Sequence, residues 1–310
     1  MVCPRCGGVG YLSYNPRIGF YVKHRDGRTC YVPRDTSLEV LQYFDKPRQF
    51  LRYMGSDYHI LKYLLKMVPP HRCYVEVFGG SAVLLLNKSP SKVEVYNDVD
   101  NDLVNLFVVI RDRFDVFIRK LRWIPYARTQ YYEFLKKYDE IEDPVDKAVA
   151  TYFILKASFA GKFGKGFGTS KVTNHAKAFY SSIEELELLR ERLTNVIIEN
   201  LDFREVIKRY DSKETFFYLD PPHLYISTER SLDYLKTGFT VKDYMDLLKL
   251  LESIEGKFLL KQTLTDNELI RWARRNGFRV RMIRFKLSAG LVRDAERREE
   301  TYIFVANYRI

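Results

Sequence analysis

The hydrophobic pattern of this chain alternates between short apolar runs and longer segments with helical spacing. Runs of four or five residues rich in Val, Ile, Phe and Tyr predict buried strands. Between them, apolar residues recur every three or four positions, which predicts amphipathic helices. Strands that alternate with helices indicate an open, largely parallel sheet, and two final strands without a helix between them predict an antiparallel pair. We therefore expect an α/β protein.

The pattern also sets the expected bounds of each element. The predicted strands of the sheet are residues 74–78, 93–96, 196–199, 216–219, 257–260, 278–285 and 300–308. The predicted helices are residues 57–67, 82–88, 102–121, 129–137, 144–156, 184–193, 204–209, 241–252 and 266–276. Three shorter strands, at 11–14, 20–23 and 29–32, predict a separate β-hairpin segment near the N-terminus.

One of these strands, Phe216 to Leu219, ends in Asp220-Pro221-Pro222-His223. Proline cannot continue a central strand, and Pro222 restricts Pro221 to extended geometry. The carbonyl of Pro221 and the carboxylate of Asp220 are then two fixed acceptors at the end of a strand. Two such acceptors suit a flat base whose amino group donates one N–H to each of them. His223 would then stack on that base. A strand-ending turn is the other interpretation of the same residues.

A second candidate site follows the strand at 74–78. The turn Gly79-Gly80-Ser81 leads into a helix, and its glycines let the backbone approach a ligand at a helix N-terminus. Asp98 ends the next strand, eighteen residues after Gly80. At that offset an acidic side chain reaches the ribose hydroxyls in nucleotide-binding folds.

A basic, glycine-rich tract favours nucleic-acid contact. No acidic residue lies between Asp146 and Glu184, and the segment 158–168 interleaves glycine, lysine and phenylalanine. Lys162 and Lys165 are expected to neutralise phosphates, and the phenylalanine rings to stack. The candidates for reading base edges are Thr169, Ser170 and Asn174, with Asn174 the strongest. Nine arginines between 271 and 298 predict a second basic surface.

Composition narrows the class of protein. The 310 residues carry a formal charge of +11, which favours a polyanionic partner. No apolar run approaches the ~18 residues of a membrane span, and no signal-peptide core precedes the first strands. We expect a soluble, cytoplasmic protein.

The four cysteines are too few for a secreted disulfide framework. Cys3, Cys6, His24 and Cys30 flank the N-terminal hairpin and supply four tetrahedral ligands for one structural zinc. A Cys3–Cys6 redox pair is the alternative. Cys73 is expected to be an inert core residue.

In combination these motifs resemble the AdoMet-dependent DNA adenine-N6 methyltransferases, in the class that places the recognition segment between the cofactor motif and the catalytic motif. The resemblance covers about residues 49 to 308. It rests on the segments 74–88, 95–107, 200–203, 219–222 and 300–308, in the family's order.

The resemblance implies a Rossmann-like catalytic domain at 49–123 and 195–310 and a mostly helical DNA-recognition domain at 124–194. The hairpin segment at 1–35 is not part of the usual family core, and residues 36–48 are expected to be a linker. It implies base flipping in double-stranded DNA and direct methyl transfer from S-adenosyl-L-methionine (AdoMet), with Asp220 and the Pro221 carbonyl holding the amine. Phe78 and Gly80 would line the methionine part of AdoMet, Asp98 its ribose, and Asp202 with Phe203 its adenine. The remaining cofactor positions implied are Tyr53, Gly55, Glu76, Gly79, Ser81 and Asp220.

Two positions depart from the family pattern. The catalytic motif ends in His223 where the family has Tyr or Phe, and Gly55-Ser56-Asp57 stands where Gly-Gly-Lys is usual. Three alternatives stay open: an N4-cytosine methyltransferase, an RNA or protein-glutamine methyltransferase, and a nucleic-acid-binding protein with a degenerate cofactor site. The two departures motivate the last of these.

Overall fold

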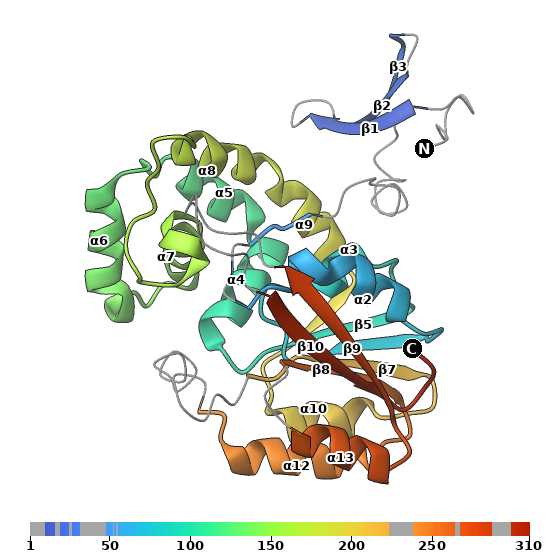
Figure 1. Ribbon diagram of the computed structural model, residues 1–310. Coiled ribbons are helices and arrows are strands. Elements are labelled where there is room, and N and C mark those ends of the chain that lie inside the picture. The colour runs from blue at the N-terminus through green and yellow to red at the C-terminus, as the bar shows by residue number, and fades with distance from the viewer. Residues whose placement is uncertain are drawn as a thin grey trace. The chain divides into compact units, whose positions relative to one another are not determined.

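A computed structural model describes residues 10–15, 19–24, 27–31, 48–51, 53, 55–222, 238–263, 267–286 and 299–310. Contacts divide the chain into two compact units. The helical unit comprises residues 1–61, 80–90 and 101–196, and the sheet unit comprises residues 62–79, 91–100 and 197–310. Figure 1 shows the elements of both.

The sheet unit is built on seven strands in the order β6-β5-β4-β7-β8-β10-β9. The strands are β4 (Cys73–Glu76), β5 (Val93–Asn97), β6 (Val196–Glu199), β7 (Thr215–Leu219), β8 (Lys257–Thr263), β9 (Arg279–Lys286) and β10 (Glu299–Ala306). β4 pairs in parallel with β5 and β7, and β7 with β8, whereas β10 is antiparallel to both β8 and β9. The predicted sheet, with its antiparallel pair at one end, is confirmed.

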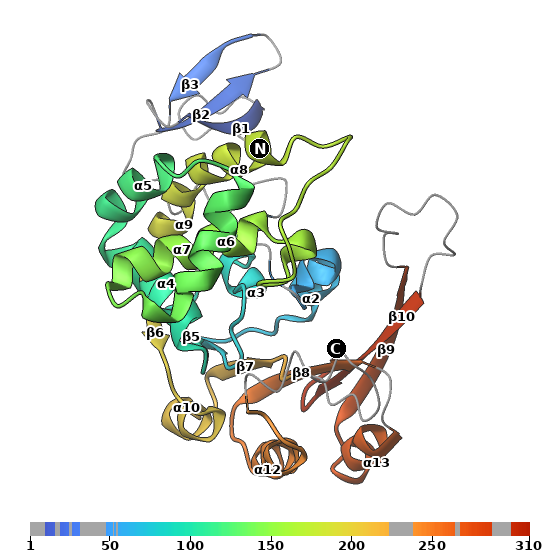
Figure 2. The same cartoon turned by 90° about the vertical axis from the view of Figure 1, so that its left-hand side faces the viewer.

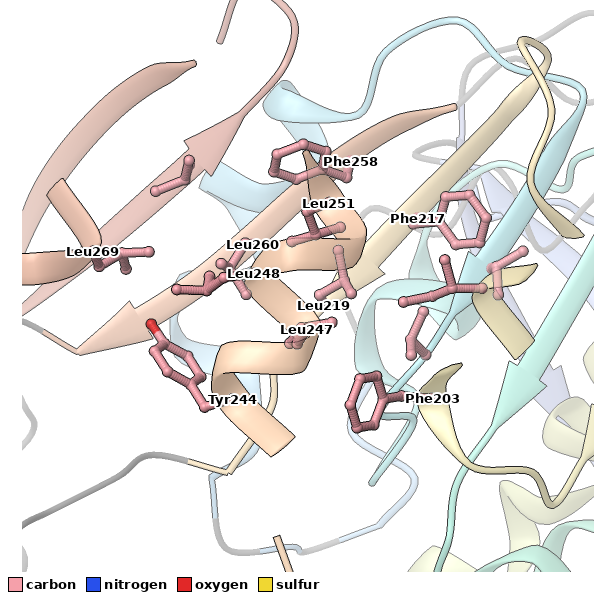
Figure 3. Close-up of a cluster of buried hydrophobic side chains, with 14 of the residues drawn as sticks. Phe203, Phe217, Leu219, Tyr244, Leu247, Leu248, Leu251, Phe258, Leu260 and Leu269 are labelled. Carbon is pink, nitrogen blue, oxygen red and sulfur yellow. The ribbon is translucent and has the colours of Figure 1, made fainter. Parts of the chain in front are cut away.

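Side chains on this sheet alternate between two faces. Phe217, Leu219 and Leu260 point to one face and join a buried cluster with α10 (Phe203–Tyr210), α12 (Val241–Leu251) and α13 (Asn267–Arg275) (Figure 3). Figure 2, which views the sheet nearly edge-on, shows these three helices together on one side. On the other face lies α2 (Leu61–Met67), where Tyr63 meets Phe285 edge-on at 5.1 Å between ring centroids. The sheet is therefore covered on both faces.

The helical unit is organised around one helix, α7 (Pro144–Ala157), which is buried on nearly every side. A helix that is apolar all round belongs inside a bundle, and α4, α5, α6 and α8 all contact α7. The other helices described in this unit are η2 (Asp57–Ile60), α3 (Val83–Asn87), α4 (Asn101–Asp112), α5 (Phe114–Arg122), α6 (Arg128–Lys137), η3 (Tyr138–Glu140), η4 (Phe159–Gly161), α8 (His175–Glu184) and α9 (Leu186–Leu193).

The N-terminal hairpin has three antiparallel strands, β1 (Gly10–Asn15), β2 (Gly19–His24) and β3 (Thr29–Tyr31). Within the residues that the structure describes, no helix is long and apolar enough to cross a membrane.

Two helices differ from the predicted ones, and β8 extends three residues beyond its predicted end at Leu260. The long helix expected at 102–121 breaks at Arg113, whose φ of −129° and ψ of 33° are not helical. Residues 175–184 form α8, although the sequence pattern predicted no helix there. Because α4 and α5 contact α7, they belong to the helical unit. The recognition domain expected at 124–194 stays a prediction.

Candidate active site

The strand order of the sheet reverses between β4 and β7. From β4 the chain moves outward to β5 and then β6, whereas from β7 it moves outward in the other direction to β8. In open α/β sheets, ligands bind beyond the carboxyl ends of the strands at such a reversal. Glu76 ends β4, Asp98 directly follows β5 and Asp220 directly follows β7, so three predicted site residues come from the expected edge.

Asn97 holds the loops at this edge together. Its side-chain amide donates to the carbonyls of Val77 and Leu201 at 2.9 and 3.1 Å, and its Oδ1 accepts from the Leu201 N–H at 2.9 Å. The side chain is 1% exposed. The loop after β4 and the loop after β6 are thereby fixed to the end of β5.

Gly79 has a packing reason to be glycine. Its N–H donates to the Asn97 carbonyl at 2.7 Å, and a Cβ at this position would lie 2.2 Å from the ring of Tyr96. No side chain fits in that space. Gly80 follows with a φ of +48°, a backbone conformation that favours glycine. The glycines shape the turn as predicted.

Asp98 combines an anchored backbone with a partly accessible carboxylate. Its Oδ1 accepts from the N–H of Asp100 at 2.9 Å, and its carbonyl accepts from the Asn200 side chain at 2.8 Å. The residue is half-buried. A carboxylate has about four lone-pair sites, so Asp98 retains the capacity to accept from hydroxyl groups of a ligand.

Three aromatic rings form a cluster beside these loops. The ring centroid of Phe78 lies 5.8 Å from that of Phe203 and 5.7 Å from that of Phe239, and Phe203 lies 5.8 Å from Phe239. Phe203 is buried, whereas Phe78 and Phe239 are half-buried.

Glu76, predicted to contact the cofactor, is buried and accepts from the Tyr74 hydroxyl at 2.7 Å.

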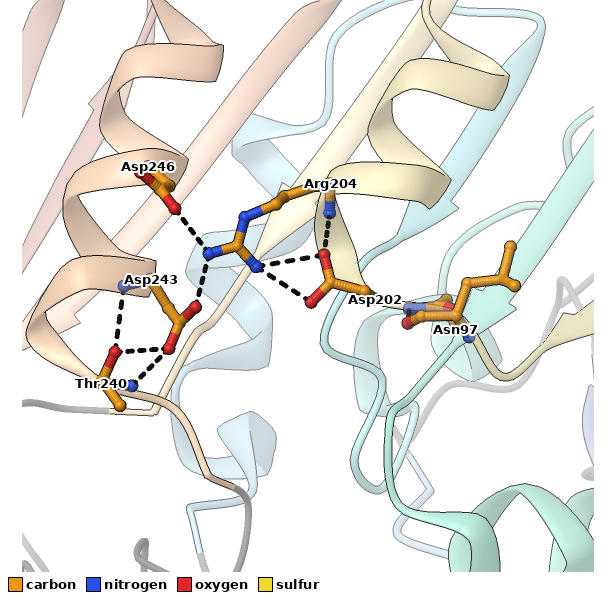
Figure 4. A network of polar contacts seen from close by, with 7 residues as sticks. Asn97, Asp202, Arg204, Thr240, Asp243 and Asp246 are labelled. Atoms are coloured by element: carbon orange, nitrogen blue, oxygen red, sulfur yellow. Dashed lines mark hydrogen bonds and ion pairs between the residues drawn. The ribbon is translucent and has the colours of Figure 1, made fainter.

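Asp202 already has a structural role. It caps α10 by accepting from the Arg204 N–H at 2.8 Å, and it pairs with the guanidinium of the same residue at 3.0 Å. Arg204 also binds Asp243 and Asp246, which joins α10 to α12 (Figure 4). Hydrogen bonds from Thr240 and then Arg204 lower the pKa of Asp243 to about 2. Sequence reasoning did not find this network.

The catalytic motif is described up to Pro222. Asp220 is 18% exposed, Pro221 is buried and Pro222 is half-buried. The carboxylate of Asp220 pairs with the ammonium of Lys261 on β8, at 2.7 Å between Nζ and Oδ2. His223 lies outside the described residues. The sequence pattern missed Lys261 because it ended the strand at Leu260; a lysine inside a buried strand was the available signal.

Four predicted cofactor residues belong to the helical unit, Tyr53, Gly55, Gly80 and Ser81. Gly55 has a φ of +82°, and the Tyr53 ring lies 3.4 Å from where a Cβ on Gly80 would stand. Ser81 is buried and donates to the Ser56 hydroxyl at 3.2 Å. Their contact with a cofactor stays a prediction.

Residues 158–168 of the basic tract form a loop that backbone hydrogen bonds close. The N–H of Phe159 donates to Gly166 and that of Gly168 to Ala157, which closes residues 158–168. Phe163 packs on Tyr138 at 4.9 Å, and the ring of Phe167 is also packed against tyrosines. Only Phe159, 62% exposed, keeps an open ring among the three phenylalanines of this loop.

The predicted base readers differ in their availability. Asn174 is exposed, but its Oδ1 caps α8 by accepting from the N–H of Lys177 at 2.9 Å. The hydroxyl of Ser170 accepts from the N–H groups of Val172 and Thr173. Thr169 is exposed. Lys162 is half-buried and Lys165 exposed, so both ammonium groups are within reach of solvent.

The hairpin register places two predicted zinc ligands on one face. Val22 opposes Cys30 and Lys23 opposes Thr29, so His24 and Cys30 are diagonal neighbours on the same side. Cys3 and Cys6 lie outside the described residues. In the part of the chain that is described, no group of three or more His, Cys, Asp or Glu side chains is placed to hold a metal.

Comparison with known proteins identifies the family of this chain. Residues 53–283, about three quarters of the chain, match the family described as D12 class N6 adenine-specific DNA methyltransferases. The chain belongs to this family.

Individual relatives have low sequence identity to this chain but align over about two thirds of it or more. The DNA adenine methylase of Escherichia coli K12 is 24% identical over 222 residues, which cover 67% of this chain and 77% of that protein. The DNA adenine methylase of Serratia marcescens is 24% identical over 242 residues, covering 73% of this chain and 86% of that protein. A solved structure from Pyrococcus horikoshii, described provisionally as an RNA methyltransferase, aligns over 88% of this chain with 12% identity and a TM-score of 0.35, which is too low to carry an argument.

The family match confirms the prediction of an AdoMet-dependent DNA adenine methyltransferase with an α/β, mostly parallel sheet. It favours adenine over the N4-cytosine alternative.

Proposed function

We propose that this chain transfers the methyl group of AdoMet in line to the N6 amine of an adenine flipped out of double-stranded DNA, and that Asp220 and the Pro221 carbonyl accept the two amine hydrogens. The observation that carries the proposal is the position of Asp220. It follows a fully buried strand at the reversal of the sheet, directly before two prolines. Acceptors fixed in this way orient the amine lone pair and stabilise the positive charge that develops on nitrogen.

AdoMet supplies the electrophilic methyl group. The chain's own residues fit its three parts by their chemistry. The half-buried Asp98 carboxylate suits the ribose hydroxyls, and the rings of Phe78 and Phe203 offer an apolar wall for adenine and for the methionine chain. Among the bonds described, Oδ2 of Asp202 accepts only from Arg204. It therefore retains the capacity to accept from the amine on the adenine of AdoMet.

The helical unit is proposed to bind DNA through its basic tract. Lys162 and Lys165 would contact phosphates, and Phe159 is the ring available to stack on a base. Of the three base readers proposed, Thr169 is the exposed side chain that no capping bond engages, while Ser170 and Asn174 would read bases only by giving up the bonds described above.

A structural zinc held by Cys3, Cys6, His24 and Cys30 remains part of the proposal. The shared face of His24 and Cys30 supports it. Elemental analysis of protein purified without metal affinity should find about one zinc per chain. Replacing Cys3 and Cys6 with serine should release that zinc and leave AdoMet binding unchanged. Metal-free wild-type protein would refute this assignment.

The central test is Asp220→Ala. Losing an acceptor in the transition state should cost on the order of 2–4 kcal/mol, or roughly 30- to 1000-fold in rate. The assay is formation of N6-methyladenine, measured by mass spectrometry, in long unmethylated DNA that contains all short sequences. AdoMet affinity, measured by calorimetry, should not change.

If the Asp220→Ala variant methylates DNA at the wild-type rate, Asp220 has no role in methyl transfer. Wild-type protein that binds no AdoMet would instead favour the alternative of a DNA-binding protein with a degenerate cofactor site, which His223 and Asp57 motivated.

A further inference from the structure

Lys261 is a buried ammonium beside the proposed catalytic carboxylate. β7 and β8 run in parallel with Leu219 opposite Leu260, so Asp220 and Lys261 follow as neighbours on the same face. Nζ of Lys261 lies 2.7 Å from Oδ2 of Asp220 and 5.2 Å from the ring centroid of Tyr302 on β10. The lysine side chain is 2% exposed.

Stability alone does not explain a lysine at this position. Burying an ammonium costs several kcal/mol in desolvation, and a buried ion pair is often no more stable than apolar side chains of the same volume. The residues before Lys261 on this strand, Phe258 to Leu260, are fully buried and apolar. A leucine or methionine would continue that pattern without the desolvation cost. The charge therefore points to a role at the carboxylate.

We propose that Lys261 is a positioning residue for methyl transfer: it keeps Asp220 ionised and, by binding Oδ2, fixes the plane of the carboxylate that receives the adenine amine. This inference rests on the proposed function. Lys261 touches neither substrate in this scheme and acts through Asp220. A single ammonium at Oδ2 leaves the carboxylate with acceptor capacity, since its two oxygens offer about four lone-pair sites.

The pairing also sets a limit on the charge of the site. Asp220 and Lys261 together carry almost no net charge. Asp220 therefore acts on the amine more as an oriented hydrogen-bond acceptor than as a negative charge. Other ionisable side chains that the strand register places on this face are Tyr74 and Glu76 of β4, Tyr218 of β7, Lys257 of β8 and Tyr302 of β10. Glu76 is the acidic one, and it accepts from Tyr74.

The test is Lys261→Met, compared with Lys257→Met as a matched control. Lys257 lies at the other end of β8, where its ammonium donates to the carbonyl of Pro70 at 3.0 Å. Single-turnover methylation of long unmethylated DNA should be measured with saturating AdoMet across pH 4.5 to 9. We expect K261M to lower the rate constant roughly 10- to 100-fold and to move its acidic limb upward by about one pH unit or more, because the opposite charge that favours ionised Asp220 is gone. K257M should do neither.

Two further measurements separate positioning from folding. AdoMet affinity of K261M should stay within about twofold of wild type, since the cofactor loops do not involve Lys261. In the background of Asp220→Asn, adding K261M should cause no further loss of rate. The asparagine has no charge that Lys261 could stabilise. If K261M does not fold, Lys261→Gln replaces it, and the upward shift of the acidic limb is again the expected result.

The outcomes distinguish this inference from the proposed function. An active wild-type enzyme with an unshifted K261M profile overturns the role of Lys261 and leaves Asp220 in place. A loss of rate that is equally large in the Asp220→Asn background also overturns it. Wild-type protein that forms no N6-methyladenine at any pH overturns both proposals.

Discussion

Asn97 and Leu201 are joined by reciprocal hydrogen bonds: the asparagine amide donates to the leucine carbonyl at 3.1 Å and its Oδ1 accepts from the leucine N–H at 2.9 Å. The two residues are 104 positions apart in the chain. This pair fixes the loop that carries Asp202 and Phe203 next to the end of β5, where Asp98 begins the following loop.

Asn97→Ala should therefore lower both stability and cofactor affinity. Three buried or half-buried backbone groups lose their partner, which we expect to cost about 2 kcal/mol of unfolding free energy. AdoMet affinity should fall at least several-fold, because Asp98 and Phe203 lose their fixed relation.

Asn307→Ala is the matched control for Asn97→Ala. Asn307 makes the same reciprocal contact with Phe258 and Gly256 at the start of β8. It should lose stability in urea unfolding without a change in AdoMet affinity. Equal AdoMet affinity in both variants would contradict the role of Asn97 at the cofactor site.

Asp98→Ala should weaken AdoMet by roughly 1.5–3 kcal/mol through lost charge-assisted hydrogen bonds to the ribose. Calorimetry measures this directly, and DNA affinity should not change comparably. Asp100→Ala is the control, since Asp100 contributes its backbone N–H to Asp98 and a substitution keeps that group. If affinity drops with Asp100→Ala instead, Asp100 binds the ribose.

Lys162 and Lys165 changed together to alanine should weaken binding to every DNA sequence alike. Each ammonium that neutralises a phosphate releases about one counterion, so the slope of log affinity against log salt should fall by about 2. Lys208 and Lys213, both exposed in the sheet unit, supply the control pair. An unchanged slope would move the phosphate contacts elsewhere, with the exposed arginines of α13 and β9 the next candidates.

The two substitutions Asn174→Ala and Asn174→Ser separate helix capping from base reading. Serine caps a helix nearly as well as asparagine, whereas alanine loses about 1 kcal/mol. We expect only the alanine variant to destabilise the helical unit, and neither to alter which DNA sequence is methylated. Thr169→Ala should instead relax base choice at one position by roughly 1–3 kcal/mol. Relaxed choice in both Asn174 variants would restore Asn174 as the base reader.

Asp243→Asn should lower stability in a pH-dependent way. The pKa of Asp243 is about 2, below its ordinary value of 3.8, because the folded state stabilises the charged carboxylate through Thr240 and Arg204. That contribution is complete above pH 4 and is lost as pH falls toward 2. After allowance for solvent screening we expect a deficit of about 1 kcal/mol at pH 6.

Urea unfolding followed by tryptophan fluorescence at pH 2.5 and 6 tests this. Asp246→Asn, which removes an Arg204 contact but leaves the cap of α12, should show a smaller deficit. A deficit for Asp243→Asn that is the same at both pH values would contradict the linkage.

Local sequence patterns were enough to predict the mostly parallel sheet and to propose where the site lies on it. Apolar runs identified β4, β5 and β7, and a glycine after β4 and a proline after β7 marked where those two strands end. The same local chemistry identified Asp98, Asp220 and the glycine turn, since each stands directly beside a strand end. It also predicted α7, which begins at a proline with Asp143 as its cap.

The contacts between polar groups that are distant in the sequence become visible only in the folded chain. Lys261 reaches Asp220 from 41 positions away, and Arg204 joins Asp243 and Asp246 from about 40. Such contacts depend on strand register and on helix packing across the core, which no local pattern encodes. For the same reason Phe163 and Phe167, which the pattern offered as stacking rings, are packed against tyrosines, and Asn174 caps a helix that the sequence did not predict.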